Sequence, residues 1–328
     1  MKEPRRSDTY QKRSIEWLWH PFIQKGAINL LTGGPGTGKS TIACDIAAAL
    51  SKGRALPGET EATAKERGVR RTWLFNAEDD PEDTICWRLD NQGADRSNIW
   101  INSVDEAISF SVMDFITKHV KSNNIDLIVI DPVQAWIPAD TDMHRANQMR
   151  EWGNLFRKLC LETNVTVLWV RHRRKGDSDD ASSINSGLGS IDMSGIVRSE
   201  LGAVSTKKGS KVVRIKGSVG RTGLELSYSI EGTDEPGNDH GALKWSGAIQ
   251  EPRTTERIVR SKANPLDSWI IGLLFDGPMK RQDIIDAAVR LGYKEGTVDR
   301  RAEPLVTKEN GMWRLKSASE LDEQHTSS

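Results

Sequence analysis

A glycine-rich stretch directly after an apolar run constrains the fold of this chain more than any other feature. Residues 27–33, "AINLLTG", are typical of a strand that is buried on both faces, and "GPGTGKST" follows at once. The segment from Gly33 to Ser40 matches the pattern G-x-x-x-x-G-K-[ST], and a helical pattern covers residues 39–51. A strand, a glycine loop and a helix in this order direct backbone N–H groups and the helix dipole at a phosphate. The pattern predicts a P-loop rather than an ordinary glycine-rich turn.

Each part of this loop has an expected role. Lys39 should reach the β- and γ-phosphates of a nucleotide, and the Ser40 hydroxyl should bind Mg²⁺. The predicted nucleotide-binding residues are Gly33, Gly34, Pro35, Gly36, Thr37, Gly38, Lys39, Ser40 and Thr41.

Acidic residues follow two other predicted strands. "IDLIVID" (125–131) ends in Asp131. A strand-end aspartate taken alone more often caps a turn, but alongside the P-loop we expect Asp131 to hold the metal together with Ser40. Pro132 follows Asp131, so the carboxylate that activates water must come from elsewhere. Glu78 lies at the end of "RTWLFNA" and could orient and deprotonate the attacking water.

Alternating strand and helix patterns predict an α/β domain with a mostly parallel sheet covered by helices. Between a disordered tail (1–13) and a linker (251–264), we expect this domain to occupy residues 14–250. The expected strands are 27–33, 71–77, 125–131 and 165–172, the expected helices are 39–51, 81–92, 105–122 and 143–163, and a hairpin is expected from 211–217 and 224–230.

A smaller unit is expected at 265–316, where three amphipathic helices precede a hairpin signal at Asn310-Gly311. This order is typical of a winged helix-turn-helix, and the polar residues 317–328 are expected to form a disordered tail. Arg300 and Arg301 are the candidate DNA contacts on its recognition helix. Because acidic and basic residues nearly balance in this unit, protein docking remains an alternative to DNA binding.

The composition restricts the class of protein. Lysine plus arginine and aspartate plus glutamate number 46 each, so the overall charge provides no electrostatic argument for nucleic acid. The three cysteines are too few and too widely spaced for a disulfide framework or a zinc site, which favours a reducing cytoplasm. The sequence has no apolar run that could span a bilayer and no signal peptide, so we expect a cytoplasmic protein without a membrane partner.

Five segments together resemble the RecA-like ATPases of the DnaB-type helicase superfamily. The chain is particularly similar to plasmid RepA-type hexameric replicative helicases and to related phage and mobile-element ATPases, over about residues 17–230. The segments are "GAINLLTGGPGTGKSTIACDIAAALSKG", "LFNAEDDPEDTICWRLDNQGAD", "IDLIVIDPVQAW", "VLWVRHRRKG" and "RIKGSVGRTG". The resemblance implies a RecA-like P-loop NTPase core that uses ATP and Mg²⁺.

The resemblance also assigns roles to residues outside the P-loop. Glu78 matches the catalytic glutamate, and Asp131 matches the Walker B aspartate. His172 matches a polar residue that senses the γ-phosphate, and Lys216 matches a lysine that reaches the ATP site of the neighbouring subunit. In the family an arginine follows this lysine two positions later, where this chain has Ser218.

Because this chain has Ser218 at that position, no residue is assigned as the arginine finger, which is the arginine that contacts the ATP of a neighbouring subunit. Arg214 and Arg221 are nearby substitutes, and the sequence favours neither. Without such an arginine, hydrolysis should be slow, because arginine fingers contribute about 10³–10⁵-fold to the rate.

Each of the following residues or groups of residues has two possible roles. Arg173, Arg174 and Lys175 could hold the phosphates of a single DNA strand or form a solvated charge run. Arg88 could border the nucleotide base or pair with a neighbouring acid. Trp136 could stack on a base or pack in the core.

Taken together, these features predict an ATP- and Mg²⁺-dependent motor that acts on single-stranded DNA in replication or recombination. It would assemble as a ring, with a hexamer favoured, or as a filament, and replication proteins are possible partners. The alternative is a slow, ATP-gated DNA-binding or loader module that does not translocate. A small-molecule kinase is a third reading, but it would not explain Glu78 or Lys216.

Overall fold

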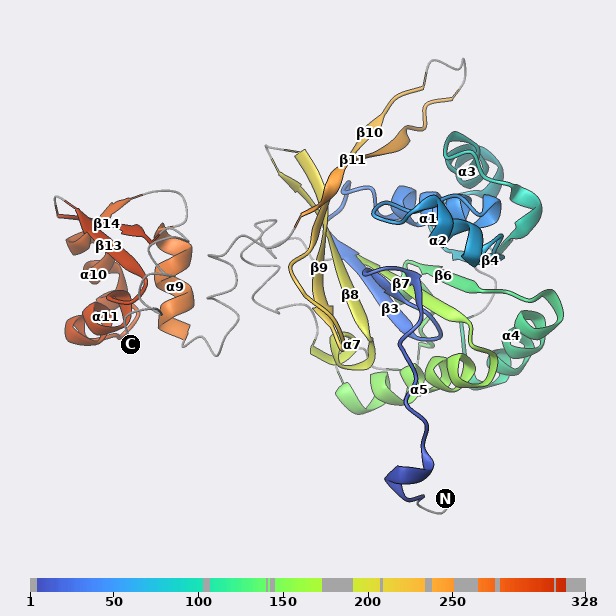
Figure 1. Ribbon diagram of the computed structural model, residues 1–328, viewed down its shortest axis with the longest axis horizontal. Helices are drawn as coiled ribbons and strands as arrows, with labels where there is room; N and C mark the ends of the chain where they lie inside the picture. The colour runs from blue at the N-terminus through green and yellow to red at the C-terminus, as the bar shows by residue number, and fades with distance from the viewer. Residues whose placement is uncertain are drawn as a thin grey trace. The chain divides into compact units, whose positions relative to one another are not determined.

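Two units make up the structure, which is a computed structural model (Figure 1). The first comprises Met1–Gln250 and the second Glu251–Ser328. The structure describes residues 5–102, 107–139, 141, 145–172, 191–206, 209–233, 238–250, 265–274, 278–309 and 311–316. The predicted linker and C-terminal tail lie outside these residues, and the described part of the predicted N-terminal tail contains a 3-10 turn at Ser7–Thr9.

A mixed sheet forms the centre of the first unit. Its nine described strands have the order β11-β10-β9-β8-β3-β7-β6-β4-β5. The six strands from β8 to β5 pair in parallel, whereas β9, β10 and β11 extend the sheet by antiparallel pairing. The prediction of a mostly parallel sheet is confirmed. The strands are β3 (Ile28–Gly33), β4 (Thr72–Asn76), β5 (Ile99–Asn102), β6 (Leu127–Asp131), β7 (Thr166–His172), β8 (Ser199–Thr206), β9 (Gly209–Gly217), β10 (Glu225–Glu231) and β11 (Ala242–Gln250).

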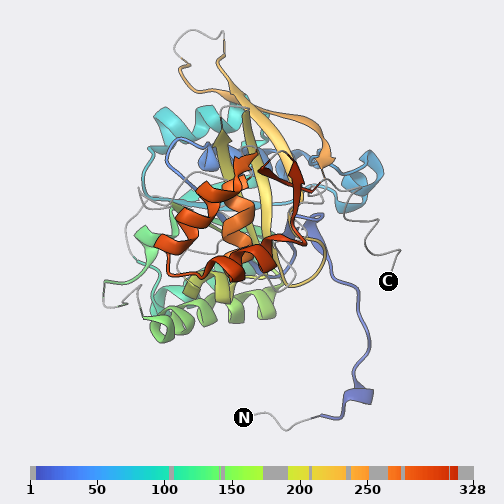
Figure 2. The same cartoon turned by 90° about the vertical axis from the view of Figure 1, so that its left-hand side faces the viewer.

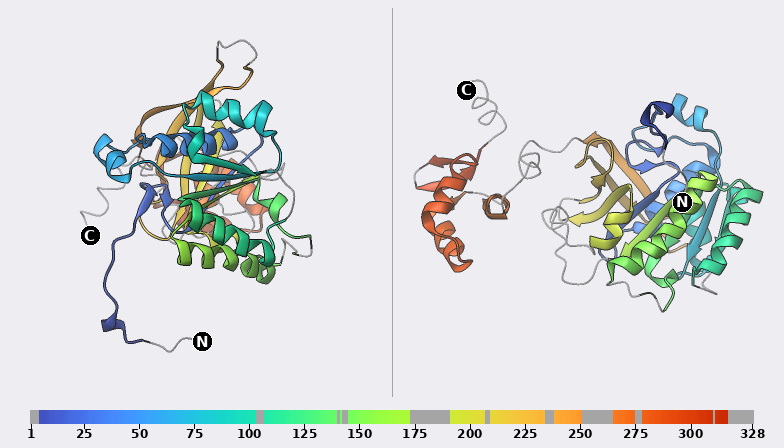
Figure 3. Two further views of the ribbon diagram at one scale, coloured as in Figure 1. Left: turned by 90° about the vertical axis from the view of Figure 1, so that its right-hand side faces the viewer. Right: turned by 90° about the horizontal axis from the view of Figure 1, so that it is seen from below.

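Helices cover both faces of this sheet (Figure 3, left). On one face, α1 (Lys39–Lys52) and α3 (Cys86–Asn91) pack into an apolar cluster that includes Leu31 and Val129. On the other face, α4 (Phe110–Asn123) and α5 (Ala146–Thr163) pack into a second cluster around Trp169. Burial on both sides explains why β3, β6 and β7 are almost continuously apolar in the sequence.

Shorter elements complete the first unit. Two short strands pair antiparallel before β3, and two short helices follow α1 and β7 along the chain. They are β1 (Trp17–Trp19), β2 (Ile23–Gln24), α2 (Glu61–Arg67) and α7 (Ile191–Ile196). None of the helices in the described ranges is both long and apolar enough to cross a membrane.

The sequence-based element predictions were partly wrong. The helix expected at 81–92 is present, but its first part, Pro81–Ile85, is π-helical and α3 follows it directly. The helix expected from residue 105 begins only at Phe110. β8 was not predicted, since Gly202 and Glu200 interrupt its apolar pattern although it lies directly beside β3.

The second unit combines helices with a small antiparallel sheet (Figure 2). Its described elements are α9 (Pro265–Leu274), β12 (Met279–Lys280), α10 (Arg281–Arg290), α11 (Glu295–Ala302), β13 (Val306–Glu309) and β14 (Met312–Leu315). The sheet order is β12-β14-β13, and Trp313 of β14 is buried in the core with Ile270 and Ile284. Helix order and hairpin agree with the predicted pattern, whereas the assignment to the winged-helix class stays a prediction.

Candidate nucleotide-binding site

The glycine loop connects the carboxyl end of β3 to α1. Gly36 (φ 73°) and Gly38 (φ 76°) adopt left-handed backbone conformations, which glycine reaches without strain. Gly38 is the N-cap of α1 and provides no capping side chain, so the first N–H groups of the helix remain available to an anion. The loop therefore has the conformation that the sequence pattern predicts for phosphate binding.

The Lys39 side chain lies inside this loop. Its Nζ donates a hydrogen bond to the carbonyl oxygen of Gly34 at 2.7 Å, and the Thr37 hydroxyl donates to the same oxygen at 3.0 Å. Burial lowers the pKa of the Lys39 ammonium, while the carboxylates of Asp131 and Glu78 oppose this shift. A buried ammonium group whose hydrogen bond goes to a neutral carbonyl oxygen is strongly stabilised when a negatively charged phosphate binds beside it.

Strand register brings the other predicted residues to the same edge of the sheet. Gly33 of β3 pairs with His172 of β7, and Asn76 of β4 pairs with Asp131 of β6. All four residues stand at the carboxyl ends of parallel strands, where open α/β sheets bind their ligands.

The Asp131 carboxyl group fits a metal ligand. Its Oδ1 is buried and has no hydrogen-bond partner among the described residues. Burial raises the pKa of this carboxyl, and the Ser40 hydroxyl, His172 and Lys39 partly offset the shift. The described residues contain no group of three acidic, histidine or cysteine side chains that could hold a metal alone. A serine and one aspartate fit Mg²⁺, which is usually bound through one or two protein ligands plus phosphate oxygens.

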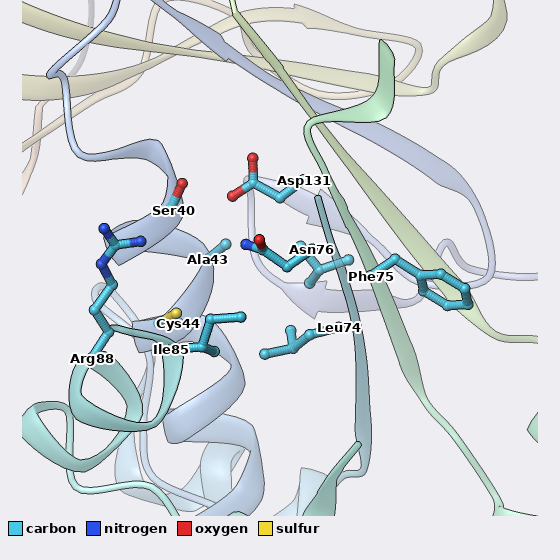
Figure 4. Close-up of a pocket in the computed structure, with 10 residues that line it drawn as sticks. Ser40, Ala43, Cys44, Leu74, Phe75, Asn76, Ile85, Arg88 and Asp131 are labelled. Atoms are coloured by element: carbon cyan, nitrogen blue, oxygen red, sulfur yellow. The ribbon is translucent and has the colours of Figure 1, made fainter. Parts of the chain in front are cut away.

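A pocket lies between the start of α1 and the ends of β4 and β6 (Figure 4). Its lining includes the polar side chains of Ser40, Asp131, Asn76 and Arg88. Arg88 also pairs with Asp79 at 2.5 Å, so the neighbouring acid that the sequence suggested as its partner is present. Arg88 lines the same pocket as Ser40, and its proposed contact with the nucleotide base stays a prediction.

Glu78 contacts His172 across the edge of the sheet. Its Oε2 lies 3.1 Å from His172 Nε2, and the two side chains are 52% and 33% exposed. The Asn76 side-chain oxygen accepts hydrogen bonds from the backbone N–H groups of Glu78 and Asp79, at 3.0 and 2.7 Å. Gln134 donates to the backbone oxygen of His172 at 3.3 Å. A partly exposed carboxylate that is held by a neighbouring side chain can receive a proton from water.

A family model described as "AAA domain" matches residues 3–178, more than half of the 328 residues. The chain belongs to this AAA-domain family. The membership supports ATP binding and ATPase activity, and the matched range contains the glycine loop, Glu78, Asp131 and His172. No curated protein matches the chain at a significant level.

Lys216 lies outside the matched AAA-domain range, on β9. Its Nζ donates to the carbonyl oxygens of Ser194, at the end of α7, and of Val197, the latter at 3.4 Å. In the structure of the single chain, Lys216 therefore stabilises the end of α7. A contact with a neighbouring subunit would require it to leave these carbonyl groups.

Arg214 is 1% exposed. Its guanidinium donates to the carbonyl oxygens of Val219 and Arg221 at 2.6 and 2.5 Å and lies over the Trp17 ring. Burial lowers the pKa of this guanidinium. Arg214, one of the two substitutes considered for the missing trans arginine, is thus occupied inside its own chain. Arg221, the other, lies at the surface.

The DNA-binding role of the predicted residues stays a prediction. Arg173, Arg174 and Lys175 lie outside the described residues. Arg301 donates to both carboxylate oxygens of Asp267, so this arginine stabilises the second unit, while Arg300 is exposed on α11. Trp136 is 2% exposed and packs edge to face against Phe75, which makes it a core residue and not a stacking platform.

Sequence reasoning missed two residues that shape the AAA-domain site. Asn76 orients the backbone at Glu78 and lines the pocket, and Tyr228 of β10 donates a hydrogen bond to the carbonyl oxygen of Thr37. Asn76 lies at a strand end, two residues before Glu78, so its position in the sequence could have identified it as a site residue. Tyr228 is 191 residues away from Thr37, and nothing in the sequence pattern connects the two.

Proposed function

We propose that this AAA-domain protein hydrolyses ATP with Mg²⁺ and couples hydrolysis to single-stranded DNA in replication or recombination. The observation that carries the ATPase part is the convergence of Lys39, Asp131 and Glu78 at the carboxyl edge of one sheet. The DNA part rests on the resemblance to DnaB-type helicases.

Each of these side chains has a definite task in the proposed reaction. Lys39, already desolvated beside the loop, would hold the terminal phosphates. Ser40 and Asp131 would hold Mg²⁺, which supplies positive charge to the phosphate oxygens when bound. Glu78 would orient the attacking water and accept its proton.

His172 would connect this chemistry to the DNA. Its imidazole contacts Glu78 at 3.1 Å, and it is the last residue of β7 before the segment that contains Arg173. A displacement of that segment by DNA would therefore move the hydrogen-bond partner of the proposed base. Assembly into a ring, with a hexamer favoured, or into a filament would bring Lys216 and Arg221 to the ATP of a neighbouring copy.

A slow, ATP-gated DNA-binding or loader module is the second candidate function. It is favoured by the burial of Arg214. This burial removes one of the two substitutes for the arginine that the related helicases have at the position of Ser218. In this reading ATP binding changes affinity for DNA or a partner protein, and turnover is slow because transition-state charge is poorly compensated.

Steady-state ATP hydrolysis with and without a single-stranded oligonucleotide tests the proposal. Lys39→Ala and Glu78→Gln should each remove activity, whereas Glu82→Gln, a neighbouring exposed acid, should retain it. Stimulation by the oligonucleotide would support the motor and lead to an unwinding assay on a forked duplex. Hydrolysis that requires Lys39 but ignores DNA would refute the motor and favour the gated module.

A further inference from the structure

The antiparallel strands β9, β10 and β11 extend one end of the sheet (Figure 1), and there β10 reaches the glycine loop while β11 contacts α1. Tyr228 and Ile230 are two positions apart on β10 and therefore point to the same face. Tyr228 donates its hydroxyl hydrogen to the Thr37 carbonyl oxygen. Ile230 approaches Gly38 so closely that a Cβ on Gly38 would lie 2.4 Å from Ile230 Cδ1.

The Tyr228 hydrogen bond determines the direction of a loop N–H group. In a trans peptide the C=O and N–H bonds point in opposite directions. Since the Thr37 carbonyl is turned toward Tyr228 on β10, the N–H of Gly38 in the same peptide is turned away from β10. Backbone N–H groups of such a loop are the groups that bind phosphate oxygens.

The loop needs an external contact because of its own flexibility. Gly36 and Gly38 both have positive φ, and glycine populates several backbone regions about equally. Without a fixed partner for the Thr37 carbonyl, this peptide would sample other orientations and its N–H would be aimed correctly for only part of the time. Fixing the peptide before the ligand arrives removes this entropic penalty from binding.

The surroundings of Tyr228 hold its side chain in place. The side chain is 4% exposed, and β10 is paired on both sides, with β9 and with β11. Burial raises the pKa of the Tyr228 hydroxyl to about 12, so this group keeps its proton and remains a donor at neutral pH.

We propose that Tyr228 is a positioning residue of the nucleotide site, which holds the Thr37–Gly38 peptide in the orientation that binds phosphate. The proposal rests on the proposed nucleotide function of the loop. It assigns to the antiparallel part of the sheet a role in ligand affinity that the loop motif itself does not contain.

Tyr228→Phe tests this role because it removes the hydroxyl and keeps the ring. We expect the variant to bind both Mg²⁺-ATP and inorganic tripolyphosphate about tenfold more weakly in isothermal titration calorimetry, equivalent to about 1.4 kcal/mol. Tripolyphosphate is the decisive probe, since it has no base or ribose. The KM for ATP should rise by a similar factor with kcat nearly unchanged, because a pre-oriented N–H serves the bound substrate and the transition state alike.

The matched control is Trp152→Phe. The Trp152 indole N–H donates to the Ile108 carbonyl oxygen at 2.8 Å, and the side chain packs in the cluster around Trp169 on the other face of the sheet. This variant should lose thermal stability but retain affinity for tripolyphosphate. Equal affinity of Tyr228→Phe and the wild type, or equal weakening in both variants, would overturn the proposal.

The experiment also separates this proposal from the function on which it rests. If the wild type binds neither ATP nor tripolyphosphate, the nucleotide function itself fails, and the role of Tyr228 fails with it. If the wild type binds both and Lys39→Ala binds neither, the nucleotide function holds, and the affinity of Tyr228→Phe alone decides the present proposal.

Discussion

Replacement of Asp131 by asparagine should stabilise the protein and weaken the proposed binding of Mg²⁺ with nucleotide. The Asp131 side chain is buried, and its Oδ1 has no partner among the described residues. Burial is the largest influence on its carboxyl pKa, which rises although Ser40, His172 and Lys39 favour the charged form. The charged carboxylate therefore lowers folding stability, which is the cost expected of a side chain that serves binding.

The sign and size of the effect follow from this environment. A carboxyl pKa that is raised on folding means that the folded state binds the proton more tightly than the unfolded chain, so stability falls as pH rises from 3.8, the ordinary value, through the folded pKa. Above that range the penalty is constant. Asparagine avoids it, and a buried polar atom without a partner costs about 1–3 kcal/mol, so the melting temperature should rise by roughly 2–10 °C.

Differential scanning fluorimetry across pH, with and without Mg²⁺ and a non-hydrolysable ATP analogue, measures the effect. The advantage of Asp131→Asn over the wild type should be absent below pH 3.8 and should grow as the pH rises above this value. Nucleotide with Mg²⁺ should stabilise the wild type by about 2.7 kcal/mol at one hundred times the dissociation constant, and the variant much less. Asp114→Asn, an exposed control on α4, should stay within about 0.5 kcal/mol. An asparagine variant that is less stable than the wild type at pH 7 would refute the reasoning.

Three further substitutions test how particular side chains are used. Trp136→Ala should lower the free energy of unfolding by about 3–5 kcal/mol in urea titrations, because the ring is buried; an unchanged stability with weaker DNA binding would contradict the core assignment. Arg214→Ala should lose about 3 kcal/mol in the same assay, since two hydrogen bonds from a buried guanidinium disappear. Arg301→Ala should destabilise the second unit by about 1 kcal/mol or less, because its ion pair with Asp267 is partly exposed; a larger loss in thermal unfolding would show that the pair holds α9 and α11 together.

The sequence by itself determined the features that depend on local pattern. The P-loop, the near-continuous apolar strands β3, β6 and β7, and α1 were predictable because burial on both faces and phosphate binding leave a dense signal in consecutive residues. Glu78 and Asp131 were predictable as strand-end acids, and the parallel sheet then brings strand ends to one edge.

Only the tertiary structure decided which distant residues meet. β8 escaped prediction because its side chains alternate with polar and glycine positions, yet it pairs directly with β3. The burial of Arg214 and the contact of Tyr228 with Thr37 depend on how β9 and β10 are added to the sheet edge. The periodicity of apolar residues indicates whether a residue is buried, but it does not indicate which residues pack against it. These contacts therefore depend on tertiary packing and cannot be predicted from the sequence pattern.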